Sequence, residues 1–158
     1  MSVGREGMAL GPGEGKTVSI GGNQVAATLK ALGADTDGAY SFFEFTMSPG
    51  VASPPLHVHR RHAEACYVLE GEVHFQVDDE IVFGTPGFFV LAPKGVPHTF
   101  WNPAARAARM LWIYSPPGYE RTFEEMAERV PAAATADDVN RIREEIMVRY
   151  DTEFVVTS

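Results

Sequence analysis

Cysteine is almost absent from this sequence. The single example, Cys66, excludes an intrachain disulfide and a zinc site built from several thiolates. It lies in the apolar run 65–69, so we expect a small buried side chain there rather than a reactive thiol.

Long hydrophobic runs are also missing. No apolar stretch approaches the roughly 20 residues that a membrane-spanning helix requires. Residues 1–16 lack the charged-then-apolar layout of a secretory signal, so we expect no membrane partner and a cytoplasmic location.

Basic residues are scarce relative to acidic ones. The chain has 13 Lys and Arg against 21 Asp and Glu, and its formal net charge is −8. This charge opposes binding to phosphate backbones and anionic lipid surfaces, and no basic cluster offsets it. We expect no nucleic-acid partner.

Helical periodicity is absent from most of the chain, whose 158 residues suit one domain. Residues 1–16 are rich in glycine and are predicted to be flexible. Short β segments separated by turn residues predict an antiparallel all-β sandwich or barrel over 17–118, with strands at 17–20, 24–31, 40–47, 56–59, 64–70, 72–77, 80–83, 88–91, 98–101 and 107–114.

The pattern changes period near the C-terminus. Apolar residues recur at helical spacing over 119–130 and again over 135–150, where the Thr135 hydroxyl can cap the helix through Asp138. We therefore predict a helical extension over 119–158 that packs on the barrel.

All five histidines fall between positions 57 and 98. His57 and His59 are two apart on a predicted strand, so their side chains leave the same face and their Cα atoms lie about 6.6 Å apart. Both imidazoles could reach one ion, with Glu64 nearby and His98 returning from a distant strand. Each residue alone is more often a surface or hydrogen-bonded group.

Two segments carry glycine, proline and histidine at fixed spacings. The first is 50–71 and the second is 87–102, and their fixed positions are Gly50, His57, His59, Glu64, Gly71, Gly87, Pro93, Gly95, His98 and Asn102. These segments resemble the two sequence motifs of the cupin family. One departure exists, because six residues rather than five separate Gly50 from His57.

This resemblance implies a double-stranded β-helix, the cupin jelly roll, and a metal site formed by His57, His59, Glu64 and His98. Three imidazoles and a carboxylate suit one divalent transition metal, Fe, Mn, Ni, Co, Zn or Cu, rather than Ca or Mg. Four protein ligands leave two positions of a six-coordinate metal open. Glu64 is also the candidate catalytic residue, since it could detach and accept a proton from a substrate hydroxyl.

Three other polar residues of this region have open or structural roles. His62 is either a ligand, a supporting group or merely solvated, and His74 falls on the polar face of its strand and is interpreted as structural. Asn102 is interpreted as a turn or hydrogen-bonding residue rather than a ligand.

Aromatic side chains are candidates to line a substrate pocket, although aromatic residues at strand spacing are usually plain core. The candidates are Phe43, Phe45, Phe75, Phe100 and Trp112. An apolar pocket beside one metal suits an aromatic or otherwise carbon-rich small molecule.

The chain is also similar to small cupins compared with quercetin 2,3-dioxygenases, in its His-Val-His segment, its C-terminal helices and residues 150–154. That resemblance implies a metal-dependent dioxygenase for a phenolic or enolic, flavonol-like substrate. The alternatives are an isomerase, lyase or decarboxylase with the same ligands, or a non-catalytic small-molecule-binding protein. The resemblance further implies a homodimer formed by sheet packing and exchange of N-terminal strands.

Overall fold

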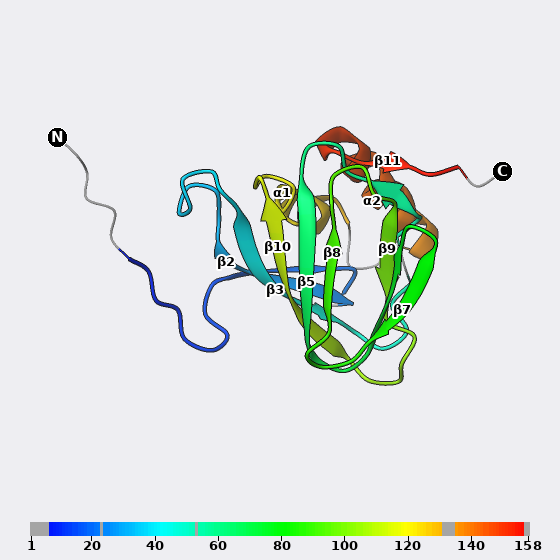
Figure 1. The fold of residues 1–158 in the computed structure, drawn as a ribbon, viewed down its shortest axis with the longest axis horizontal. Helices are drawn as coiled ribbons and strands as arrows, with labels where there is room; N and C mark the ends of the chain where they lie inside the picture. Colours follow the sequence, from blue (N-terminus) through cyan, green and yellow to red (C-terminus); the bar gives the residue numbers. More distant parts are fainter. Residues whose placement is uncertain (1–6, 23, 53, 131–134, 157–158) are drawn as a thin grey trace.

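Two antiparallel sheets face each other in the computed structural model, and two helices follow them near the C-terminus (Figure 1). The structure describes residues 7–22, 24–52, 54–130 and 135–156. The predicted all-β fold with two C-terminal helices is confirmed.

The larger sheet has six strands in the order β1-β2-β3-β10-β5-β8. Its strands are β1 (Lys16–Ile20), β2 (Val25–Ala31), β3 (Ser41–Met47), β5 (Ala63–Glu70), β8 (Phe89–Ala92) and β10 (Ala108–Ser115). The smaller sheet has the order β11-β4-β9-β6-β7. Its strands are β4 (His57–Val58), β6 (Val73–Val77), β7 (Glu80–Gly84), β9 (His98–Trp101) and β11 (Glu153–Phe154).

Alternating burial explains why these segments are strands. Along β3, Phe43, Phe45 and Met47 are buried in the core, whereas Glu44 between them faces outward and pairs with Arg109 at 2.8 Å. The period-2 pattern directs one set of side chains into the space between the sheets and the other set toward solvent.

Gly71 makes the tight reversal between β5 and β6. Its φ is +75°, and a Cβ atom at this position would lie 2.5 Å from the carbonyl oxygen of Ala107. Only glycine satisfies both the left-handed backbone and the close approach of the neighbouring strand.

The helices α1 (Arg121–Arg129) and α2 (Ala136–Tyr150) pack on each other, and α1 also contacts β1. Thr135 caps α2 as predicted, because its hydroxyl oxygen accepts from the Asp138 backbone N–H at 3.1 Å. Ile146 of α2 belongs to the same buried core as the inner barrel residues. Neither helix is long and apolar enough to cross a membrane within the part of the chain that the structure describes.

Two details of the strand predictions were wrong. The strand at 56–59 is reduced to His57–Val58, and residues 153–154, which carry no alternating pattern, form β11 beside it. The last described residues therefore add an edge to the sheet that holds the His-x-His segment, and Figure 1 shows β11 at the same end of the barrel as α2.

If the helices and the barrel form one cooperative unit, a cavity in α2 should destabilise the barrel. Ile146 is fully buried, so we expect Ile146→Ala to lower the free energy of unfolding by about 2–5 kcal/mol. Urea denaturation followed by tryptophan fluorescence measures this, because Trp101 and Trp112 lie on barrel strands. Val148→Ala, at a 56% exposed position of the same helix, should change stability by less than about 0.5 kcal/mol. An unchanged barrel transition in Ile146→Ala would contradict a single cooperative unit.

Candidate metal centre

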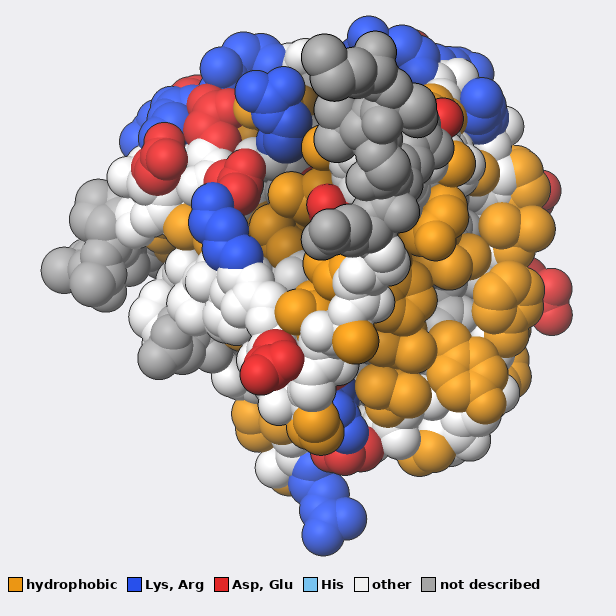
Figure 2. Space-filling view, turned by 90° about the vertical axis from the view of Figure 1, so that its left-hand side faces the viewer, with side chains coloured by type: hydrophobic (Ala, Val, Ile, Leu, Met, Phe, Trp, Pro, Cys, Tyr) orange, Lys and Arg blue, Asp and Glu red, His pale blue; other side chains and the backbone are white. Residues whose placement is uncertain are grey.

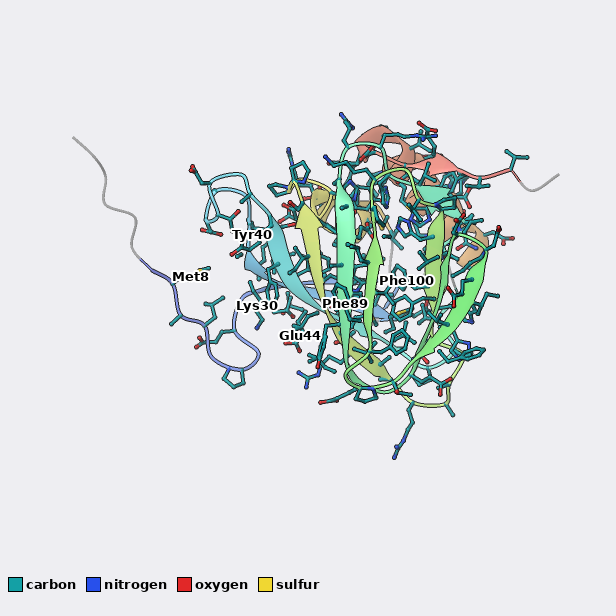
Figure 3. All side chains as sticks on the ribbon, in the orientation of Figure 1. Met8, Lys30, Tyr40, Glu44, Phe89 and Phe100 are labelled. Atoms are coloured by element: carbon teal, nitrogen blue, oxygen red, sulfur yellow. The ribbon has the colours of Figure 1, made fainter. Side chains whose placement is uncertain are left out.

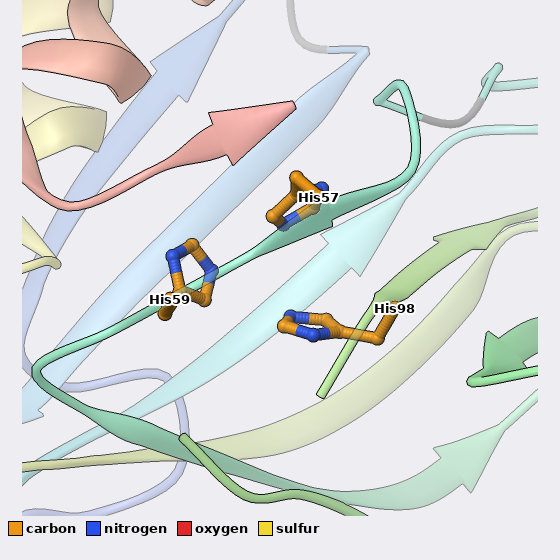
Figure 4. A group of neighbouring side chains, drawn as sticks. All are labelled: His57, His59 and His98. Atoms are coloured by element: carbon orange, nitrogen blue, oxygen red, sulfur yellow. The ribbon is translucent and has the colours of Figure 1, made fainter. Parts of the chain in front are cut away.

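Three histidine rings converge on one point inside the barrel (Figure 4). His57 lies on β4 directly opposite His98 on β9, and His59 follows β4. The ring centroids lie 4.7 to 5.0 Å apart, and one nitrogen of each ring lies within 4.8 Å of the others. All three side chains are buried. The predicted convergence of these imidazoles therefore exists in the structure.

Backbone carbonyls fix the orientation of two of these rings. The Nδ1 of His57 lies 2.7 Å from the carbonyl oxygen of Pro55, and the Nδ1 of His98 lies 2.9 Å from that of Val96. A carbonyl oxygen only accepts, so Nδ1 carries the proton in both rings and Nε2 of the neutral ring presents a lone pair. This is the arrangement in which imidazole binds a metal through Nε2.

The ring of His59 is held by a residue near the C-terminus, Asp151. The Nδ1 of His59 donates to the backbone carbonyl of Asp151 at 2.5 Å, and its ring packs on Tyr119 with centroids 4.5 Å apart. The Asp151 carboxylate also accepts from the backbone N–H groups of Arg60 at 3.1 Å and Arg61 at 2.8 Å. Asp151, the residue that directly follows α2, thus holds the loop that carries His59.

Glu64 places a buried carboxylate against these rings. Its two oxygens lie 3.0 Å from Nε2 of His59 and 3.3 Å from Nε2 of His98, yet both nitrogens lack a hydrogen-bond partner among the described residues. Lone pairs of nitrogen and oxygen therefore face one another in a buried space, which is unfavourable unless a cation lies between them. The donor set and its orphaned nitrogens fit a divalent transition metal.

The charges at this cluster are strongly coupled. Burial by itself raises the pKa of Glu64, but the imidazoles around it outweigh burial and hold the pKa well below its usual range. Burial, followed by repulsion from His98 and His59, lowers the pKa of His57 to about 3. Burial opposes a charge on His98, but the adjacent Glu64 outweighs it and raises that pKa. A proton at His98 therefore competes with a metal ion for the same carboxylate.

His62 is buried between two carboxylates. Its Nδ1 lies 2.8 Å from Asp151 Oδ2, and its Nε2 lies 3.2 Å from Glu64 Oε1. The alternative of a merely solvated side chain is therefore wrong. His62 contacts the carboxylate of Glu64 and orients it, with Asp151 as the second partner.

The other polar predictions of this region are confirmed. His74 lies outside the cluster, where its Nε2 is 2.5 Å from Glu72. The Asn102 amide donates to three backbone carbonyls, at 2.8 Å for Arg106 and farther for two others, so it fixes a turn. Cys66 is buried, and burial raises the pKa of its thiol.

A cavity of about 510 Å³ opens from this cluster, with His57 and Glu64 in its wall. Of the predicted pocket residues, Phe45 and Phe100 line it. Three others do not line it within the described chain. Phe75 and Trp112 border a separate void of about 10 Å³ that Glu64 and Phe100 also line, and Phe43 packs in the core against Tyr114 and Phe123. The alternating pattern identifies inward-facing side chains, but it does not distinguish those that line the cavity from those that pack in the core.

The sequence interpretation did not include the helices in the cavity wall. Tyr119, Phe123 and Met126 line the cavity from α1 and the loop before it, and Arg143 and Met147 line it from α2. The helical spacing of these residues was visible, but it predicts a packed face as readily as a cavity wall. Asp151 was missed for a similar reason, since its role depends on tertiary contacts.

Comparison with known proteins agrees with this architecture. The model of the cupin domain family matches residues 43–114, and no curated protein matches the sequence. KdgF from Halomonas sp. is 18% identical, with a TM-score of 0.62, and the match covers 72% of this chain and 96% of that one.

Two further structures are similar to this chain. An RmlC-like cupin from Shewanella frigidimarina NCIMB 400 is 25% identical, with a TM-score of 0.58 and coverage of 70% of this chain and 91% of that one. Ectoine synthase from P. lautus is 26% identical, with a TM-score of 0.54 and coverage of 65% and 72%. These similarities do not specifically support the narrower resemblance to quercetin 2,3-dioxygenases. With the motif residues gathered in one buried cluster and a match to the cupin domain family over residues 43–114, the barrel strands β3 to β10 have a cupin-type fold.

Proposed function

We propose that this protein binds one divalent transition metal ion through His57, His59, Glu64 and His98 and acts on a small molecule in the adjoining cavity. The observation that carries this proposal is the pair of buried, unpartnered Nε2 atoms that face the Glu64 carboxylate. Buried polar atoms without partners are rare in native proteins and require an explanation, which an ion between them supplies.

The proposed reaction is a dioxygenation of a phenolic or enolic compound. The metal, when bound, supplies Lewis acidity and an open coordination position. The apolar wall formed by Phe45, Phe100 and Phe123 excludes water and favours a flat, carbon-rich substrate. Glu64 is held as a carboxylate by its imidazole neighbours, so it accepts a substrate proton only after leaving them.

Other chemistry on the same ligands is the second candidate. One similar structure is an ectoine synthase, so a cupin fold does not by itself specify oxygen chemistry. Isomerase, lyase or decarboxylase activity, or binding without turnover, would each use the same cavity. The two experiments below separate metal binding from the type of reaction.

Removing one imidazole should remove the metal. We expect His57→Ala or His98→Ala to reduce bound Co²⁺, Ni²⁺ or Zn²⁺ from about one equivalent to less than a tenth after dialysis, because each loses a ligand and leaves Glu64 uncompensated. His74→Ala is the matched control, since that ring lies outside the cluster, and should retain the full equivalent. Metal content is measured by inductively coupled plasma mass spectrometry. Equal metal content in all three variants would contradict the proposed site.

Oxygen uptake should accompany substrate loss. We expect Fe-, Mn-, Ni- or Co-loaded protein to consume dioxygen in proportion to a phenolic or enolic substrate such as quercetin, measured with an oxygen electrode and by chromatography. Glu64→Gln should lower the rate by at least about 10²-fold, since it loses both the anionic ligand and the proton acceptor. Turnover that proceeds equally well without oxygen would select the second candidate instead.

We also propose that the chain forms a homodimer through the outer face of the larger sheet. Tyr67, Phe89, Leu91 and Ile113 point outward from β5, β8 and β10 and are 37–59% exposed. The strand register places Tyr67 beside Phe89, and Figure 2 shows hydrophobic side chains gathered on one side of the view. A contiguous apolar patch of this kind favours a two-fold contact with a second copy. The N-terminal strand β1 pairs with β2 of its own chain in this structure, so the proposal rests on the sheet face.

A charge on this face should separate the two copies. We expect Leu91→Glu to convert a dimer into a monomer in size-exclusion chromatography with light scattering, because two carboxylates would be brought together across the two-fold axis. Ile81→Glu alters a similarly exposed residue on β7 of the other sheet, at 53%, and should leave the dimer intact. A monomeric wild-type protein at micromolar concentration would refute this proposal.

A further inference from the structure

We propose that Arg143 binds an anionic group of the substrate, a carboxylate, at the helical wall of the cavity. This inference rests on the proposed function, because it assigns the substrate to the cavity that adjoins the metal cluster. It narrows the substrate class from uncharged phenols and enols to carboxylic acids. The carboxylate of such a substrate would lie away from the part of the molecule that reaches the metal cluster.

One face of α2 forms this wall. Ala136, Val139, Asn140, Arg143 and Met147 all line the cavity, and they follow one another at intervals of three, one, three and four residues. This spacing places them on a single side of the helix. Arg143 is the one cationic side chain among the described residues that line the cavity, and its neighbours on this face are apolar or amide groups.

Arg143 lacks a counterion within the described part of the chain. Its Nε is buried without a hydrogen-bond partner, and a terminal amino group donates to Asn140 Oδ1 at 3.0 Å. The other arginines of α2 differ, since Arg141 pairs with Asp138 and Glu145, and Arg149 pairs with Glu125. The ion pairs of Arg141 and Arg149 lie on the exposed surface. Arg143, which has no such pair, lines the cavity.

Burial without a counterion is unfavourable for a guanidinium. It lowers the pKa of Arg143, although Glu144 and Tyr119 partly offset the effect. A planar guanidinium presents several N–H donors in a fork that matches a carboxylate, and a ligand carboxylate would satisfy the free Nε. The absence of a counterion for the Arg143 guanidinium is therefore explained by a binding site for an anionic ligand.

Tyr119 connects this end of the cavity with the metal cluster. Its ring packs on His59 and His62, with centroids 4.5 and 4.6 Å apart, and it lines the same cavity as Arg143. Glu64 is the one acidic side chain among the described lining residues, so a carboxylate is favoured at the Arg143 end and disfavoured at the cluster unless a metal ion is bound there. The cavity thus suits an acid with an apolar body.

The test compares an acid with its uncharged analogue in metal-free full-length protein. The probes are 4-phenylbutanoate and 4-phenylbutan-1-ol, which share an aromatic body and differ in charge. We expect isothermal titration calorimetry to give at least tenfold tighter binding of the acid to the wild type. Arg143→Met should remove this preference while leaving the affinity for the alcohol within about twofold.

Two further variants complete the design. Arg143→Lys should keep a reduced preference, because it retains the charge and loses the fork. Arg141→Met, on the outer face of α2, should retain the full wild-type preference. Thermal unfolding checks the fold, and Arg143→Met should be at least as stable as wild type, since it removes an unpaired and partly buried cation.

The outcomes separate this inference from the proposed metal site. Equal binding of acid and alcohol to wild type, or an acid preference that survives Arg143→Met, would overturn the role of Arg143. An acid preference that depends on Arg143 in a protein that binds no metal under any condition would support this inference while refuting the metal site.

Discussion

A buried carboxylate that faces imidazole nitrogens is the constraint on which the arrangement of this protein depends. Glu64 is charged and buried at the wall of the cavity, and Nε2 of His59 and of His98 lies near it without a hydrogen bond. Carbonyl acceptors fix the Nδ1 protons, so rotation or tautomer exchange does not relieve the contact, whereas a metal ion or an added proton on Nε2 does. Pairing of β4 with β9 then holds His57 and His98 opposite each other. The barrel therefore holds two imidazole nitrogens without a hydrogen-bond partner, those of His59 and His98, against one carboxylate, an arrangement that a cation would complete.

Residues near the C-terminus also hold this cluster in place, through contacts made from outside the barrel. Asp151 contacts His59 through its carbonyl and His62 through its carboxylate, and β11 extends the sheet beside β4. The helix that ends at Tyr150 also carries the cavity wall with Arg143. Phe100 on β9 lines the cavity, whereas Phe89 on β8 is exposed on the outer face, and Figure 3 labels both side chains. Metal binding and substrate selection would therefore both depend on residues beyond the family match at 43–114.

Much of this fold could be predicted from local pattern. Alternation defined the barrel strands, Gly71 marked a turn that only glycine can make, and Thr135 marked the start of α2. The histidines could be grouped because two of them share a strand and the family motifs fix the spacing of the rest. Contacts between residues far apart in the chain could not be predicted from local pattern. The buried position of His62 depends on Asp151, 89 residues away, and the two residues of β11 have no period to recognise. The cavity wall was missed because a helical stripe does not reveal whether space remains beside it.

The central claim is that His57, His59, Glu64 and His98 bind one ion directly. X-ray absorption at the zinc edge of protein loaded with one equivalent of Zn²⁺ tests it most directly. The account predicts a first shell of nitrogen and oxygen at roughly 2.0–2.2 Å, with outer-shell scattering that fits three imidazoles. A spectrum that fits only oxygen neighbours, or a shell containing sulfur, would contradict the account.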